Sequence, residues 1–74
     1  MMYAGYKING NKANEFKADA IKLFSNDVLK QELSARMINL NRESMSFDLD
    51  VRNNCPSEIM ELAVKHGEGF NSFA

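Results

Sequence analysis

The chain has 74 residues, with nine Lys and Arg against ten Asp and Glu, one Cys and one His. This length allows one small domain, because domains typically have about 100 to 150 residues and shorter chains bury little apolar surface. The single Cys excludes an internal disulfide, and one Cys with one His falls short of the ligand set of a structural zinc site. We therefore expect a single domain over residues 1–74, without metal or cofactor, that gains stability from contact with another protein chain.

Hydropathy and charge argue against a membrane protein, a secreted protein and a nucleic-acid-binding protein. No segment approaches the roughly 20 apolar residues of a membrane span, and no basic leader opens the chain. An unpaired thiol is typical of reducing compartments, so we expect a cytoplasmic protein without membrane contact. The net charge of −1 lacks the basic excess that phosphate binding usually needs, so a nucleic-acid partner is not expected.

Residues 2–9 alternate in a way that is typical of a strand. Tyr6 lies on one face of this strand, and Tyr3 and Lys7 lie on the other. The Asn-Gly-Asn turn at residues 9–11 ends it, because Gly and Asn tolerate the backbone angles of tight turns.

Residues 13–24 predict a helix, because their apolar side chains recur at spacings of three and four. The stripe consists of Phe16, Ala20, Leu23 and Phe24. Asn11 or Asn14 is a suitable N-cap. An unbroken helix would carry Asp27 into this stripe, where an unpaired carboxylate is costly to bury. We therefore predict a restart at Ser25, as the cap of a second helix over residues 28–35.

Residues 35–41 fit two structures. Leu33, Met37 and Leu40 continue a helical stripe, whereas Ile38 and Leu40 fit a short strand. The turn-prone residues 41–44 favour the strand, because they would join it to the next segment as a hairpin with a four-residue loop.

The stretch SMSFDLDVR, residues 44–52, alternates most clearly of all. We predict a strand with Met45, Phe47, Leu49 and Val51 facing inward and with Ser46, Asp48, Asp50 and Arg52 facing water. Asn53 and Asn54 break this strand. A last helix then starts near Pro56, buries the stripe that ends in His66, and stops at Gly67. Residues 68–74 have no period, and Phe70 and Phe73 are either docked on the domain or part of a loose tail.

Together these elements predict an α+β domain of two layers, with helices on one face of a small sheet. The preferred element order is β-α-β-β-α, and the alternative is β-α-α-β-α. Either order leaves a sheet edge exposed, and such edges invite pairing with another chain.

The candidate catalytic groups lack partners. Asp48 and Asp50 are roughly 6.5 to 7 Å apart along a strand, a spacing that two catalytic carboxylates could use, but so short a chain has no room for a deep cleft. Cys55 and His66 lie at opposite ends of one helix, so they cannot form a nucleophile-base pair within one chain. We therefore expect a protein that is not an enzyme.

The remaining hypothesis is a protein-binding module, a small inhibitor or regulator that occupies a surface of a larger partner protein. We also expect the chain to form a homodimer. The expected contact residues are Tyr3, Lys7, Asp48, Asp50 and Arg52, on the open face of the sheet. Two alternatives stay open: a small nucleic-acid-binding regulator, and a subunit that completes an enzyme site at an interface.

Overall fold

The computed structural model describes residues 5–70. Its elements are β1 (Gly5–Ile8), α1 (Ala13–Ala20), α2 (Asp27–Arg36), β2 (Met37–Asn41), β3 (Ser46–Asp50), α3 (Ser57–His66) and β4 (Glu68–Phe70). Short 3-10 turns, η1 (Gly10–Lys12) and η2 (Ile21–Leu23), precede and follow α1. The α+β class is confirmed, and the helical segment between β1 and β2 is split in two, as Asp27 led us to predict.

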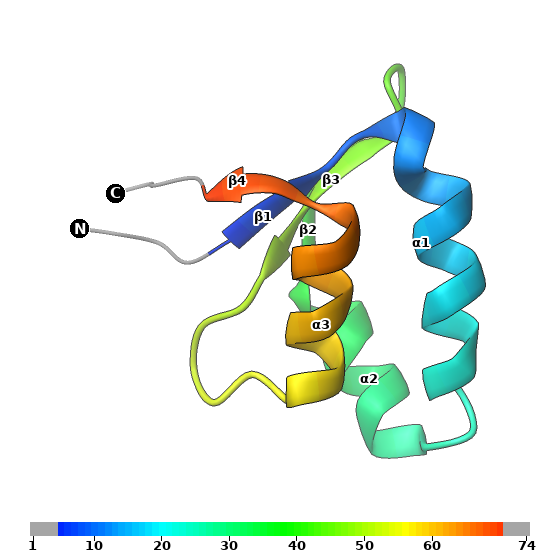
Figure 1. Ribbon diagram of the computed structural model, residues 1–74, viewed down its shortest axis with the longest axis vertical. Helices are drawn as coiled ribbons and strands as arrows, with labels where there is room; N and C mark the ends of the chain where they lie inside the picture. The colour runs from blue at the N-terminus through cyan, green and yellow to red at the C-terminus, as the bar shows by residue number, and fades with distance from the viewer. Residues whose placement is uncertain (1–4, 71–74) are drawn as a thin grey trace.

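The strands β2, β3 and β1 form an antiparallel sheet, and the short β4 adds to the outer side of β1, giving the order β2-β3-β1-β4 (Figure 1). The β1–β3 register pairs Gly5 with Asp50, Tyr6 with Leu49, Lys7 with Asp48 and Ile8 with Phe47. Of the two possibilities left open for the tail, residues 68–70 follow the docked one, because they pair as a strand with β1. Phe73 lies outside the described residues.

The three α-helices cover one face of the sheet (Figure 1). Side chains from β1, from β3 and the residue after it, and from all three α-helices fill the space between the layers. This core consists of Ile8, Phe16, Ala20, Leu33, Phe47, Leu49, Val51, Ile59, Leu62 and Ala63. Its apolar burial is the main source of stability for so short a chain.

The ambiguous segment forms the hairpin and not the longer helix. α2 ends at Arg36, and β2 begins at the next residue and pairs with β3. The pairing is irregular, because the register shifts between Ile38 and Asn41, and Asn39 between them has a left-handed φ of 55°. β2 therefore has a bulge in its centre, and Leu40 is exposed instead of buried.

Both predicted helix caps are wrong. Asn26, and not Ser25, caps α2, because its side chain accepts hydrogen bonds from the backbone N–H groups of Val28 at 3.0 Å and Leu29 at 3.2 Å. At α1, neither Asn11 nor Asn14 is the cap. The 3-10 turn η1 leads directly into α1, and no side chain caps the first N–H groups of the helix.

The start of β3 also departs from the predicted alternation. Phe47, Leu49 and Val51 are buried as predicted. Met45 is 57% exposed, because it belongs to the hairpin turn and has a left-handed φ of 57°. Ser46 is buried instead of exposed, and its hydroxyl lies 2.7 Å from that of Ser44 in the same turn.

Gly67 ends α3 as predicted, but for a different reason from the one usual at helix ends. Its φ of −84° is open to any residue. A Cβ at this position would lie 2.5 Å from the carbonyl oxygen of Ala63 and 2.6 Å from the Cβ of Tyr6. The glycine is therefore needed because the end of α3 passes directly against β1.

Arg36 is a buried cation that the sequence pattern did not reveal; it is 7% exposed. Its guanidinium donates hydrogen bonds to the carbonyl oxygens of Asp50 at 3.0 Å and Asn53 at 2.9 Å, and also to that of Arg52. Its Nε donates to Glu32 at 2.8 Å. One side chain thus ties the end of α2 to the chain that leaves β3.

We predict that Arg36→Met lowers the free energy of unfolding by about 2–4 kcal/mol, because it leaves these carbonyl oxygens without their donor. Urea unfolding followed by circular dichroism measures the change. The matched control is Arg42→Met in the exposed hairpin turn, with an expected effect of about 0.5 kcal/mol or less. Equal stability of the two variants would contradict this role for Arg36.

Candidate functional site

The open face of the sheet carries the predicted contact residues in two pairs. Lys7 and Asp48 lie side by side on neighbouring strands. Asp48 also accepts a hydrogen bond from the Asn39 side chain at 2.9 Å. These side chains line a shallow polar hollow of about 280 Å³. Tyr3 lies outside the described residues, so its predicted role in contact stays a prediction.

The second pair is Asp50 with Arg52. The Arg52 guanidinium lies 3.0 Å from one carboxylate oxygen of Asp50, and the backbone N–H of Arg52 donates to the other at 2.9 Å. These bonds hold the pKa of Asp50 below its usual range. A carboxyl group with a lowered pKa is a weak general base and cannot keep the proton of a general acid near neutral pH. The pair is suited to a polar contact and not to acid-base catalysis.

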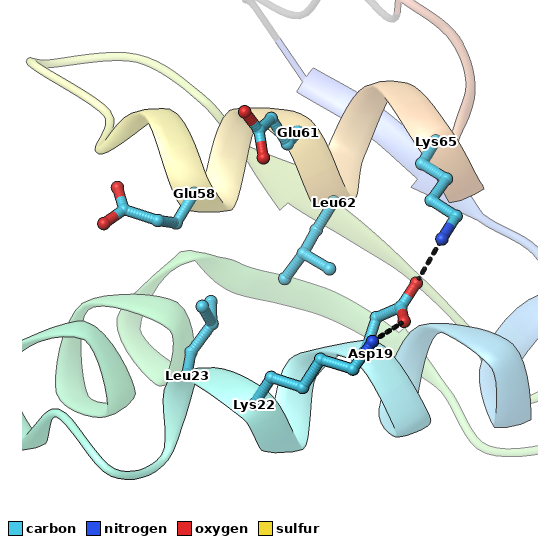
Figure 2. A pocket seen from close by; sticks show the side chains of 7 residues that line it. All are labelled: Asp19, Lys22, Leu23, Glu58, Glu61, Leu62 and Lys65. Atoms are coloured by element: carbon cyan, nitrogen blue, oxygen red, sulfur yellow. Dashed lines mark hydrogen bonds and ion pairs between the residues drawn. The ribbon is translucent and has the colours of Figure 1, made fainter.

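A second hollow, of about 240 Å³, lies between α1 and α3 (Figure 2). Leu23 and Leu62 form its apolar floor, and Asp19 is approached from two sides by lysines. The Nζ atom of Lys65 lies 2.9 Å from the Asp19 carboxylate, and that of Lys22 lies 3.3 Å from it. The Asp19 carboxylate is therefore paired with both lysines, while Glu58 and Glu61 of α3 add two further carboxylates to the lining.

The Asp19 carboxylate also meets the buried ring of His66, with 2.7 Å between Oδ2 and Nε2. The same ring packs edge-on against Phe16, with 6.0 Å between centroids. The predicted structural role of His66 on the buried stripe of α3 thus has a specific form. It joins α3 to α1 together with Lys65.

These hydrogen bonds, first from Lys65 and then from His66 and Lys22, hold the pKa of Asp19 well below its usual value. The bond to Asp19 raises the pKa of Lys65. A carboxyl group whose pKa is lowered on folding stabilises the fold above its unfolded pKa, and this contribution is lost as the pH falls. The cluster is a clamp between two helices.

We predict that the wild-type chain loses stability as the pH falls below the usual Asp pKa of about 3.9, and that Asp19→Asn is less stable than the wild type at neutral pH and loses less on acidification. Urea unfolding at a series of pH values measures both effects. Glu61→Gln, which changes an exposed carboxylate of α3, is the control. A pH dependence unchanged by Asp19→Asn would contradict the clamp.

Cys55 precedes α3 and packs against the core. Its Sγ lies 3.5 Å from the carbonyl oxygen of Pro56. Burial raises the pKa of this thiol, and the positive charge of Arg36 only partly offsets the rise. Because the thiolate is the reactive form, Cys55 is a packing residue and a poor nucleophile.

We predict that iodoacetamide alkylates Cys55 more slowly in the folded chain than in urea at the same pH, because both burial and the raised pKa reduce the accessible thiolate. Mass spectrometry of timed samples measures the rate. Faster reaction in the folded state would reveal an activated thiol.

The third hollow is an apolar groove of about 330 Å³, between α1 and the β2–β3 hairpin. Its lining residues come from α1, the segment after η2, α2 and the β2–β3 hairpin: Ala13, Phe16, Lys17, Ala20, Phe24, Leu33, Met37, Leu40, Met45 and Phe47. Lys17 is the single charged residue among them. We call this feature the apolar groove.

The floor of the apolar groove is part of the core, and its rim is exposed. Phe16 and Phe47 form the floor and meet edge to face, with 5.2 Å between ring centroids. The exposed rim consists of Phe24, Met37, Leu40 and Met45. The rim residue Leu40 is 60% exposed, although a leucine of this kind is usually buried.

Sequence reasoning missed the apolar groove because it placed its rim residues inside the domain. Phe24 belonged to the predicted core stripe of α1, and Met45 to the inward face of β3. The available signal was an excess of apolar side chains over the positions that the two layers can bury. The structure gathers four of these exposed side chains around one groove, whose rim lies apart from the predicted contact residues of the open face.

Residues 5–70 offer neither a membrane-spanning helix nor a metal site. No helix there is long and apolar enough to cross a membrane. Within the same range, no group of three or more His, Cys, Asp or Glu side chains is placed to hold a metal ion. Comparison of the chain with protein-family models, with curated proteins and with solved structures gives no match.

Proposed function

We propose that this chain is a non-enzymatic protein-binding module, a small regulator or inhibitor that binds a larger partner protein through its apolar groove. The proposal keeps the function expected from the sequence and moves the main contact from the open face of the sheet to the groove. The polar pairs of the open face supply a second, smaller contact.

One observation carries the proposal. Among residues 5–70, four of the seven exposed large apolar side chains surround this single groove. Apolar side chains scattered singly over a surface are ordinary, whereas a contiguous patch with a hollow marks a site of interaction. Aromatic and methionine side chains are also enriched at the centres of protein interfaces. Phe24, Met37 and Met45 supply both types here.

The occupant that we propose is a different protein and not a second copy of this chain. Two grooves brought face to face would set one rim lysine, Lys17, in the same apolar patch as its copy, without a carboxylate among the lining residues to pair with it. In such a dimer, the exposed rim side chains of each copy would also have to fill the groove of the other copy. The homodimer expected from the size of the chain stays a prediction, which sedimentation velocity tests.

The two alternatives have less support. A nucleic-acid site needs several basic side chains on one surface, and the groove lining holds only Lys17. A shared enzyme site at Asp48 and Asp50 would use carboxylates that are already bound to Asn39 and Arg52.

We predict that Leu40→Glu abolishes capture of the partner from a lysate of the source cells, because it places a charge on the rim where the partner must exclude water. Val64→Glu is the matched control: Leu40 and Val64 are both 60% exposed, but Val64 lies on α3 and does not line the groove. The measurement is affinity capture followed by mass spectrometry, with a stoichiometric protein retained at high salt.

A second variant separates loss of binding from loss of folding. Met45→Gly removes a rim side chain and relaxes the left-handed backbone, so the chain should be at least as stable as the wild type and still bind more weakly. Equal capture by the wild type, Leu40→Glu and Met45→Gly would contradict the proposal. A captured nucleic acid, lost steeply with added salt, would favour the first alternative.

A further inference from the structure

We infer that the apolar groove takes an amphipathic α-helix of the partner, with acidic residues beside its apolar anchors. This inference rests on the proposed function, since it names the kind of segment that the same groove binds. It follows from the backbone of β2, from the charges at the groove and from the burial of the chain's own helices.

The backbone of β2 argues against a strand as the occupant. β2 is an edge of the sheet beside the groove, and a partner strand added there would need a regular row of free N–H and C=O groups. The left-handed Asn39 and the shift of register between Ile38 and Asn41 interrupt that row. A helix satisfies its own backbone hydrogen bonds, so it needs only a hollow for its side chains.

The charges at the groove favour carboxylates on the occupant. Lys17 lies on the lining, and the Nζ atom of Lys30 lies over the ring of Phe24, 5.5 Å from its centroid. No acidic residue is among the lining residues. Acidic side chains flanking the apolar anchors would therefore meet cations at the rim, whereas basic ones would be repelled.

A second copy of the chain does not offer such a helix. The apolar face of α3 includes Ile59, Leu62 and Ala63, which are buried in the core. Phe16 of α1 and Leu33 of α2 are buried and already line the groove. The exposed large apolar side chains of these helices are single ones, Val28 on α2 and Val64 on α3, and a single side chain does not make an apolar helix face. Unfolding a copy to free one of these faces would cost its core, so the helix comes from another protein. Two adaptable thioethers on the rim, those of Met37 and Met45, suit such a side-chain contact.

The test is a selection from a displayed library of random peptides of about 20 residues, long enough to form a helix on binding. The intact wild-type chain is the target, and the Leu40→Glu chain removes peptides that bind elsewhere. We expect enriched peptides with apolar residues at i, i+3 or i+4, and i+7, with Glu or Asp beside them, and with helical circular dichroism in the complex.

A charge exchange then tests the acidic flanks. Lys17→Glu should weaken binding of an enriched peptide about two- to fivefold, as expected for an exposed ion pair, and replacing the flanking Glu of the peptide by Lys should restore it. Lys12→Glu makes the same change of charge beside α1 but off the groove, and should leave the affinity unchanged. Fluorescence anisotropy of the labelled peptide measures each affinity.

Several outcomes overturn the inference. They are enriched peptides with strand-like alternation or basic flanks, no enrichment over the Leu40→Glu chain, and self-association of the wild type that Leu40→Glu abolishes. The lysate experiment separates this failure from that of the proposed function. If a partner is captured through the groove while the peptides show no acidic helix, the proposed function stands and the helical occupant is wrong. If neither binds, both are wrong.

Discussion

A single guanidinium at the end of α2 meets three backbone carbonyls of the chain that leaves β3. Because Arg36 directly precedes Met37, the same contact sets where helix gives way to strand and how β2 approaches β3. The hairpin formed by these strands is one wall of the apolar groove, and α1 is the other. Between α1 and α3, the carboxylate of Asp19 has a similar role, because it bonds to His66 and Lys65 of the other helix. Polar contacts thus position the walls of an apolar surface.

Much of the fold was predictable because its strands and helices have clear periods. The alternation of Phe47, Leu49 and Val51 predicted β3, and Asp27 predicted the break between two helices. Residues 37–41 were ambiguous, because a run that short satisfies both periods. Arg36 decides between them through bonds to residues 14 to 17 positions away, which no local pattern contains.

The candidate site was less predictable than the fold, for a related reason. Each pattern assigns a side chain to the inside or outside of one element, whereas the groove is made of side chains that several elements leave uncovered. Met45 illustrates this: the alternation placed it inside, and a left-handed turn residue turned it to the rim. Strand periodicity placed Lys7 and Asp48 on the open face, and the register sets them side by side; their role in contact stays a prediction.

The bulge at Asn39 has a consequence for how the chain behaves at high concentration. A protein with an apolar groove next to an open strand edge is at risk of forming fibres by edge-to-edge strand pairing. Apolar contact at the groove would hold two molecules together while backbone hydrogen bonds formed between their edge strands. The irregular backbone between Ile38 and Asn41 interrupts the row of hydrogen-bonding groups in the middle of the edge strand β2. Apolar side-chain contact at the groove is therefore not followed by strand pairing between molecules. This lets a chain this small keep an uncovered apolar surface in water.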